Sequence, residues 1–242
     1  MGCPPGTLAN NFWPAFGNTL FFTLVTVLLE TILGIGMALV MAKDFHGRGL
    51  LRAAVLVPWA IPTAITAKLW AFLFSEQGIV NSIFHAHVAW QTDPWAARFS
   101  IILADVWKTT PFMALLILAG LQMIPKDLYE AARMDGANAW QRFTRITLPL
   151  AKNSIIVAVL FRMLDALRMY DLPYIMVGPN PDSPTATLSQ LVVAAIRQDH
   201  VNAASALSTL IFLLIFLIAL CFVKSLGSKV AHQAEPVVAE EE

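Results

Sequence analysis

Three charged residues recur at intervals of three inside one long apolar stretch of the chain: Arg162, Asp165 and Arg168. Residues three apart lie along one surface of a helix, so these side chains can pair with one another. Such pairing leaves one net positive charge, together with donors and acceptors that suit the hydroxyl groups of a polar solute. An alternative is a structural role, in which the same residues form an ion-pair network that holds the chain against a partner subunit.

Other side chains in the apolar stretches extend this set of candidates. Ionisable groups inside a membrane span are costly and usually face a cavity or a partner, and further examples are Glu30, Lys68, Asp105, Lys108 and Asp171. Aromatic rings add surfaces on which the apolar faces of a sugar can stack. We therefore predict a solute path bordered by Trp70, Trp107, Lys108, Arg162, Asp165, Arg168 and Tyr170. Asp105 and Lys108 could instead pair with each other near the outer interface.

The composition places these residues in a membrane protein. Of the 242 residues, 57% are hydrophobic and 13% are charged, whereas about 25% of the residues of a soluble domain are charged. A helix of about 20 apolar residues crosses a bilayer. Five stretches are long enough and predict an all-α, multi-pass helix bundle: Phe16–Ala42, Ala53–Phe74, Phe99–Met123, Leu150–Val177 and Ala203–Val223.

Proline, glycine and basic residues refine this topology. Pro58 and Pro62 should kink or unwind the second span, and Gly34 and Gly36 offer the first span a close-packing face. Basic residues concentrate in the loop after the first span, in residues 124–149 and beyond the last span. By the positive-inside rule these regions, including the C-terminus, are cytoplasmic.

The polar segment between the third and fourth spans contains clear helix boundaries. Pro125 suits the first turn of a helix over Lys126–Met134, because its missing N–H is no loss there. Gly136 can end that helix in a left-handed conformation. Asn138, followed three residues later by a glutamine, resembles a capping box. We therefore predict a second short helix that runs to Thr147.

The same segment carries the most specific pattern of the chain. It reads Glu-Ala-Ala at 130–132, then Gly136, then Ile-x-Leu-Pro at 146–149. This order and spacing resemble the cytoplasmic signature of permease subunits of bacterial ABC importers. Weaker matches along nearly the whole chain resemble the branch of sugar and glycerol-phosphate permeases, and most of all the trehalose-importing subunits of actinobacteria. The outer loop of residues 177–185 departs from the family pattern, which has more glycines there.

The resemblance implies a coupling helix, an element that docks into a groove of an ATPase subunit and transmits its closure to the membrane spans. Carried over by motif position, the docking residues and their flanking contacts are Glu130, Ala131, Ala132, Arg133, Asp135, Gly136 and Arg142. From the residues alone, the alternative is an ordinary amphipathic helix at the membrane interface.

The resemblance also implies partners: a second homologous permease, two ATPase subunits that bind ATP and Mg, and an extracytoplasmic sugar-binding protein or lipoprotein, assembled in the lipid of the bacterial inner membrane. The chain itself is expected to bind no cofactor or metal and to be no enzyme. It contains no G-x-x-x-x-G-K-[ST] phosphate-binding loop and no nucleophile–base pair at useful spacing. Its basic residues are spread along the chain, which argues against a nucleic-acid partner.

We expect residues 1–228 to form the membrane domain and the acidic residues 229–242 to form a disordered cytoplasmic tail. Permeases of this branch usually have one more span at the N-terminal side, so a sixth span is expected to be missing; the alternative is a subunit with five spans. The leading functional hypothesis is a subunit of a disaccharide importer. The alternatives are import of glycerol phosphate, an oligosaccharide or another polar solute by the same machine, and an ion-coupled secondary transporter that uses Asp165 or Glu30.

Overall fold

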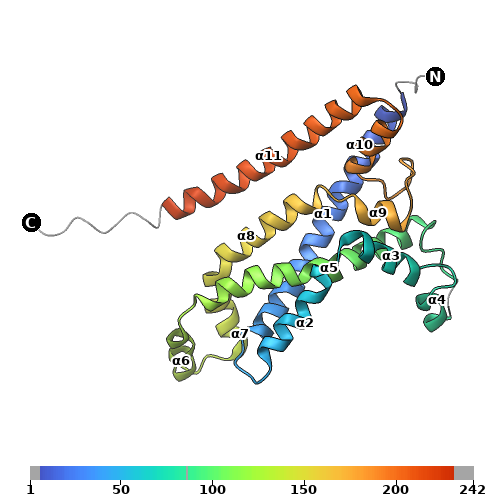
Figure 1. Cartoon of the computed structure of the whole chain (residues 1–242). Helices are drawn as coiled ribbons and strands as arrows, with labels where there is room; N and C mark the ends of the chain where they lie inside the picture. Colours follow the sequence, from blue (N-terminus) through green and yellow to red (C-terminus); the bar gives the residue numbers. More distant parts are fainter. Residues whose placement is uncertain (1–5, 86, 232–242) are drawn as a thin grey trace, which may run out of the picture.

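The computed structural model describes residues 6–85 and 87–231, and within these ranges every regular element is a helix (Figure 1). The helices are α1 (Gly6–Met41), α2 (Arg48–Ala60), α3 (Thr63–Leu73), α4 (Ile79–Phe84), α5 (Pro94–Gln122), α6 (Lys126–Met134), α7 (Ala139–Arg142), a π-helical turn (Phe143–Thr147), α8 (Leu148–Ala166), α9 (Asp171–Met176), α10 (Leu188–Arg197) and α11 (Val201–Ala231). The predicted all-α bundle is confirmed. Most of the predicted tail lies outside the described residues.

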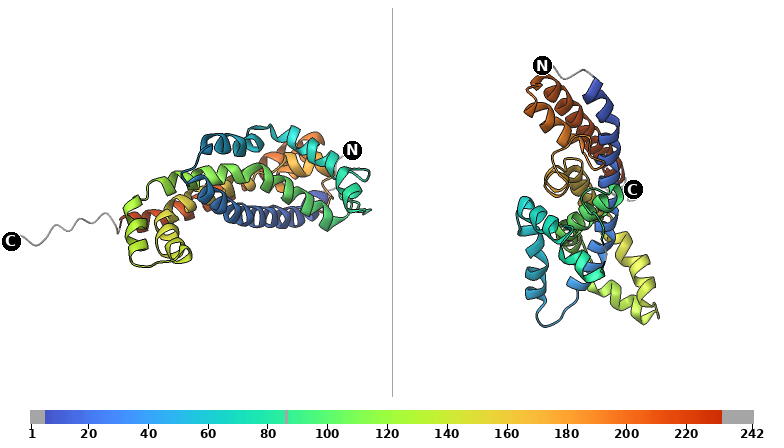
Figure 2. Two further views of the ribbon diagram at one scale, coloured as in Figure 1. Left: turned by 90° about the horizontal axis from the view of Figure 1, so that it is seen from below. Right: turned by 90° about the vertical axis from the view of Figure 1, so that its right-hand side faces the viewer.

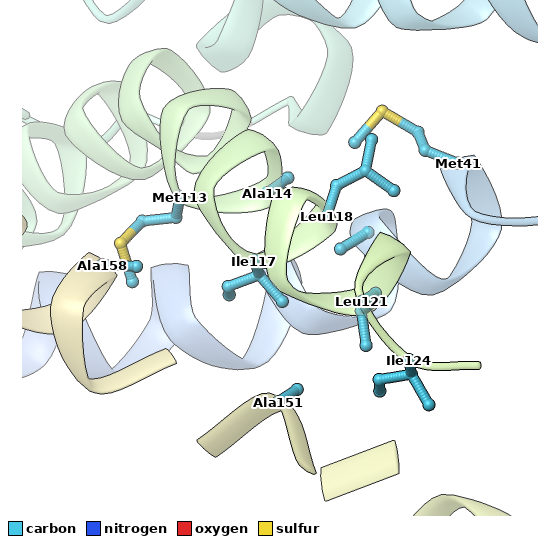
Figure 3. Packing of buried hydrophobic residues seen from close by; sticks show 10 residues of the cluster. Met41, Met113, Ala114, Ile117, Leu118, Leu121, Ile124, Ala151 and Ala158 are labelled. Carbon is cyan, nitrogen blue, oxygen red and sulfur yellow. The ribbon is translucent and has the colours of Figure 1, made fainter. Parts of the chain in front are cut away.

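The central element is α5, which packs against α1, α2 and α8. One apolar cluster joins these helices, with Met113 and Ile117 of α5 lying between Met41 of α1 and Ala151 and Ala158 of α8 (Figure 3). All five side chains are buried. The small residues on α8 let it approach α5 closely, so the core of the bundle lies along the middle and one end of α5.

The contact between α1 and α5 requires a glycine at one position. A Cβ atom added at Gly34 would lie 3.1 Å from Cβ of Met113, which is closer than side chains normally approach. At Gly36 no atom lies within 4 Å of such a Cβ. The predicted close-packing face is therefore confirmed for Gly34, whereas no described residue of this chain packs against Gly36.

The predicted spans correspond to four long apolar helices and one bent pair. The helices cover residues Asn10–Met41, Pro94–Gln122, Ala139–Ala166 and Val201–Phe222, and the pair is α2 with α3, bent by 86°. The bend lies at Ile61, which is extended and precedes Pro62. A residue before proline is disfavoured in the helical region. Pro58 lies inside α2 without breaking it, so the predicted break is confirmed at Pro62 only.

The predicted span Leu150–Val177 is wrong beyond Ala166, where α8 ends. Pro173 has no N–H to donate to the carbonyl of Met169, and a proline inside a helix also clashes with the preceding turn. That carbonyl instead accepts a hydrogen bond from Oγ1 of Thr187 at 2.8 Å. The chain leaves the helix after Ala166 and resumes as the short α9, with Pro173 in its first turn.

The sequence analysis also missed α10, because its ten residues are too few to span a bilayer. A capping box between Thr187 and Gln190 begins this helix. Its Leu188 and Leu191 are buried in a small cluster with Ala15 of α1. The segment is therefore a packed helix beside the N-terminal half of α1, where only a loop was predicted.

The basic loops gather at one end of the bundle. Figures 1 and 2 show α6, α7 and the loop between α1 and α2 at that end, with the beginning of α1, α4 and α10 at the other. Nζ of Lys126, at the start of α6, lies 2.9 Å from Oδ2 of Asp44 in the loop between α1 and α2. The charge asymmetry that the sequence shows along the chain is thus an asymmetry between the two ends of the molecule.

Candidate functional site

Arg162 of α8 is the centre of a buried ionic network that joins three helices. Its side chain is 2% exposed. Nε donates to Oε2 of Glu30 at 2.5 Å and Nη2 to Oε1 of Glu30 at 3.1 Å. Nη2 also donates to Asp105 of α5, and Nη1 donates to Oδ2 of Asp165 at 3.1 Å. These carboxylates belong to α1, α5 and α8 of this chain, so the network holds the bundle together internally.

The arrangement suits the chemistry of arginine. A guanidinium presents five donors in one plane, which allows it to meet several carboxylates at once. Glu30 accepts a further hydrogen bond from Oγ1 of Thr109 at 2.5 Å. Burying charges is costly unless each is paired and hydrogen-bonded, and here the buried carboxylates have such partners. The predicted pairing along α8 is also present, because Asp165 lies between Arg162 and Arg168, with 3.6 Å from Asp165 Oδ1 to Arg168 Nη2.

A cavity of about 340 Å³ opens beside this network. Five of the seven residues predicted to border a solute path line it: Lys108, Arg162, Asp165, Arg168 and Tyr170. The two predicted tryptophans do not. Trp70 and Trp107 pack edge-to-face on each other with ring centroids 5.7 Å apart. The structure thus brings together the charged candidates and places this pair of aromatic candidates elsewhere.

Lys108 connects the cavity to the bend between α2 and α3. Its Nζ donates to the carbonyl of Trp59 at 3.4 Å. Because α2 ends at Ala60, the carbonyls of its last turn have no helical amide partner. A cation near that helix end is favourable. Asp105 pairs with Arg162 rather than with Lys108, so the alternative pairing considered from the sequence is wrong.

Sequence reasoning missed several residues that line the cavity, of which Trp59 is the largest. Its ring stacks on Phe112 with centroids 5.6 Å apart, and it is part-exposed. The available signal was its position two residues before the predicted break at Ile61–Pro62. The charges of the lining are balanced, with three cations (Lys108, Arg162 and Arg168) and three carboxylates (Asp105, Asp165 and Asp171). The cavity is therefore polar and formally neutral.

The second candidate site is α6, an exposed helix at the basic end of the bundle. None of its residues is buried. Glu130, Ala131, Arg133, Asp135 and Gly136 are exposed, and Ala132 and Arg142 are half-buried. Met134 is 89% exposed.

The local structure of this segment follows the sequence closely. Gly136 is left-handed, with a φ of 77°. Asn138 and Gln141 form the predicted capping box, with both hydrogen bonds at 2.8 Å. Nη1 of Arg142 donates to the carbonyl of Ala137 at 2.5 Å, which fixes the turn between the two helices. The second helix is not separate, however, because it continues through the π-helical turn into α8. A movement of this segment is thereby linked directly to a membrane span.

The sequence of this chain, whose structure has an exposed polar helix leading into a span, matches a known family. The family described as the inner membrane component of binding-protein-dependent transport systems matches residues 30–232. The chain belongs to this family. The matched region contains every cavity residue as well as α6, so both candidate sites are parts of the permease domain.

Individual relatives agree with this assignment. The chain is 44% identical over 221 residues to the trehalose/maltose transport system permease protein MalF of Thermococcus litoralis, covering 89% of this chain and 75% of that protein. It is 39% identical over 219 residues to the trehalose transport system permease protein SugA of Mycobacterium tuberculosis, covering 90% and 71%. A crystal structure of a bacterial ABC transporter that imports alginate aligns with a TM-score of 0.81 at 26% identity, covering 90% of this chain and 79% of that one.

Proposed function

We propose that this permease forms the translocation path for a neutral disaccharide of the trehalose type in an ATP-driven importer. The observation that carries the proposal is the cavity beside Arg162, which offers many donors and acceptors without net charge. Sugar hydroxyls both donate and accept hydrogen bonds, so a lining of alternating cations and carboxylates suits them. The names of the two trehalose permeases that resemble this chain support the same cargo.

Within this cavity, each type of side chain has a role in holding the sugar. Arg168 and Asp171, both in the segment that follows α8, add a donor and an acceptor group to the lining. The part-exposed ring of Trp59 offers a surface for the apolar face of a sugar ring. Arg162 is held by its carboxylates and serves as the rigid wall against which the other groups are positioned.

The proposal assigns α6 to contact with an ATPase subunit. We place the basic end of the bundle, with the C-terminus, in the cytoplasm of the bacterial inner membrane, in agreement with the positive-inside rule. The exposed residues Glu130, Arg133 and Asp135 then face the cytoplasm, where two ATPase subunits bind and hydrolyse ATP with Mg. Because α7 is continuous with α8, closure of the ATPase would move the helix that carries Arg162 and Asp165.

The remaining parts of the machine complete an alternating-access cycle. A second permease supplies the other half of the path, and an extracytoplasmic binding protein delivers the sugar, as the description of the family itself suggests. Transport then proceeds by rocking of the two halves around a central site. The charge balance of the cavity weighs against an anionic cargo such as glycerol phosphate, because no net positive charge is present to offset it.

The test is ATP hydrolysis by the assembled importer in proteoliposomes. A panel of disaccharides, oligosaccharides and glycerol phosphates is added with and without the binding protein. Stimulation by a neutral disaccharide, dependent on the binding protein, supports the proposal. Stimulation of ATP hydrolysis by glycerol phosphate and by none of the sugars contradicts the proposed cargo. Uptake of sugar into the same proteoliposomes in the absence of ATP contradicts the proposed mechanism.

A further inference from the structure

A second large cavity lies at the basic end, between α6 and the loop that joins α1 to α2, with a volume of about 800 Å³. Five cations line it, accompanied by only two carboxylates, Asp44 and Glu130. The cations are Lys43, Arg48, Arg52, Lys126 and Arg133. We propose that this cavity binds the phosphate headgroup of an anionic membrane lipid.

The pairing within the cavity leaves positive charge available. Asp44 accepts from both Arg48 and Lys126. Within the part of the chain that the structure describes, Lys43 and Arg133 have no ion pair. The lining as a whole therefore carries a formal excess of three positive charges, in contrast with the balanced cavity beside Arg162.

Arg52 adds a donor that the described residues leave unsatisfied. Its Nη2 donates to the carbonyl of Met41, the last residue of α1, at 2.7 Å. Its Nε is buried and has no hydrogen-bond partner among the described residues. A buried donor without a partner is costly, and a small shift of the guanidinium would let a phosphate oxygen accept from it. Arginine and phosphate form charge-assisted hydrogen bonds of this kind.

An apolar stripe on α1 leads from the cavity along the membrane span. Leu39 and Ala42 line the cavity. Ile35, Ile32 and Leu28 continue from them at intervals of three and four residues, which places all five on one face of the helix. Ile32 and Leu28 are each more than half exposed. Leu28 and Ile32 offer an acyl chain an apolar surface, and Ile35 and Leu39, which are half-buried against the core, connect it to the cationic cavity.

This continuity favours a lipid over the other sources of the same chemistry. Free phosphate would use the cations and leave the stripe unexplained, and an acidic segment of an ATPase subunit would approach from the aqueous side. Basic pockets between spans on the cytoplasmic side suit anionic headgroups, because the inner leaflet carries negative lipids. The inference rests on the orientation given under the proposed function.

The experiment measures binding of fluorescent phosphatidylglycerol to the complete importer in nanodiscs of phosphatidylcholine. Lys43→Gln removes an exposed cation without a partner, and its matched control is Lys152→Gln, which changes the same charge on the exposed surface of α8 outside the cavity. One basic residue near a membrane surface accounts for about a fivefold change in affinity. We expect about fivefold weaker binding for Lys43→Gln, a larger loss for Lys43→Glu, and little change for Lys152→Gln.

Equal effects of the Lys43 and Lys152 variants would overturn the proposal, since they would indicate a general surface charge effect. Displacement of the lipid by millimolar inorganic phosphate would point to a phosphate site and also overturn it. Absence of lipid binding by the wild-type complex would also overturn it and would favour an acidic protein segment as the occupant of the cavity. Sugar-stimulated ATP hydrolysis in the same nanodiscs tests the proposed function separately, so failure of one inference is distinguishable from failure of the other.

Discussion

The molecule has two charged regions in contrasting surroundings. Around Arg162, charges of both signs are buried among α1, α5 and α8, and each finds a partner within the chain. On α6, the charges are exposed and no residue is buried. In the first region, the charged side chains are paired by contacts within the chain. The second is bounded by a well-defined turn, in which Gly136 follows α6 and a capping box begins α7, but its side chains face outward.

The difference between the two regions separates two kinds of function. A network that is buried and complete determines how the bundle folds and forms the rigid wall of a cavity. A helix that is exposed and followed by a fixed turn is ready to meet another protein without reorganising. Substitutions in the two regions should therefore differ in kind: those at the network should reduce stability, and those on α6 should leave stability intact and uncouple the machine.

The largest effect is expected for Arg162→Met. Removing the guanidinium leaves Glu30 and Asp105 buried without their partner, and breaking a buried ion pair in this way costs about 3–5 kcal/mol. We expect a strong loss of folded protein, measured as the thermal midpoint and as the monodisperse yield in detergent. Arg168→Gln serves as the control, because this arginine is exposed and its contact to Asp165 is 3.6 Å long.

The triple variant Arg162→Met, Glu30→Gln and Asp105→Asn sharpens this prediction. It removes the charges of both partners together with the arginine, so much of the lost stability should return while transport stays low. A thermal midpoint that does not rise from the single to the triple variant would show that the unpaired carboxylates are not the cause.

On the other side of the comparison, Glu130→Ala should leave the bundle intact. Glu130 is exposed, and alanine favours helices. Losing one partner of a charge pair that is buried and hydrogen-bonded in an interface costs about 2–5 kcal/mol, so sugar-stimulated ATP hydrolysis should collapse if α6 docks on the ATPase through Glu130. The matched control is Asp127→Ala, an exposed acidic residue of the same helix outside the signature. Equal activity of the two variants would contradict the coupling role.

A smaller effect tests how tightly α1 must approach α5 to form the network. Gly34→Ala would place a Cβ atom 3.1 Å from Cβ of Met113, and overpacking of a core costs about 1–3 kcal/mol. Gly36→Ala meets no atom within 4 Å and should be neutral. Thermal midpoints of the two variants provide the comparison, and identical midpoints would show that the helices separate without cost.

The same contrast explains what the sequence could predict. In the turn between α6 and α7 the signals are local: Gly136, Asn138 and Gln141 lie within six residues, and their predicted conformations are confirmed. Around Arg162 the decisive partner is Glu30, which is 132 residues away. Nothing in the spacing of residues on α8 points to it. The three-residue interval identified Asp165 as a partner and suggested, incorrectly, that Asp105 pairs with Lys108.

The errors in the helix boundaries have a related cause. A hydropathy pattern cannot show where a helix ends when both sides of the break are apolar. Beyond α8, Pro173 leaves the carbonyl of Met169 without an amide donor, and the hydroxyl of Thr187 takes the place of that amide. Trp59 was missed as a cavity residue because the packing of α2 on α5, which no local pattern shows, brings it beside Lys108.

The smallest effect concerns Asp44, which joins the loop after α1 to the start of α6. Lys126 hydrogen-bonds to its carboxylate, and this contact, with the charge of Arg48, holds the pKa of Asp44 below its ordinary value. A carboxylate with a lowered pKa stabilises the folded state above its ordinary pKa of about 3.9. That contribution is lost as the pH falls from there through the lowered pKa.

Because Asp44 is exposed, solvent screens the interaction and the loss should be small. We expect Asp44→Asn to leave the thermal midpoint almost unchanged at neutral pH and to flatten its decline as the pH falls below about 4. High salt should reduce the difference between the variant and the wild type, since exposed charges are screened. A variant as unstable as Arg162→Met would show that this contact orients α6, and the two charged regions would then be less distinct than the geometry indicates.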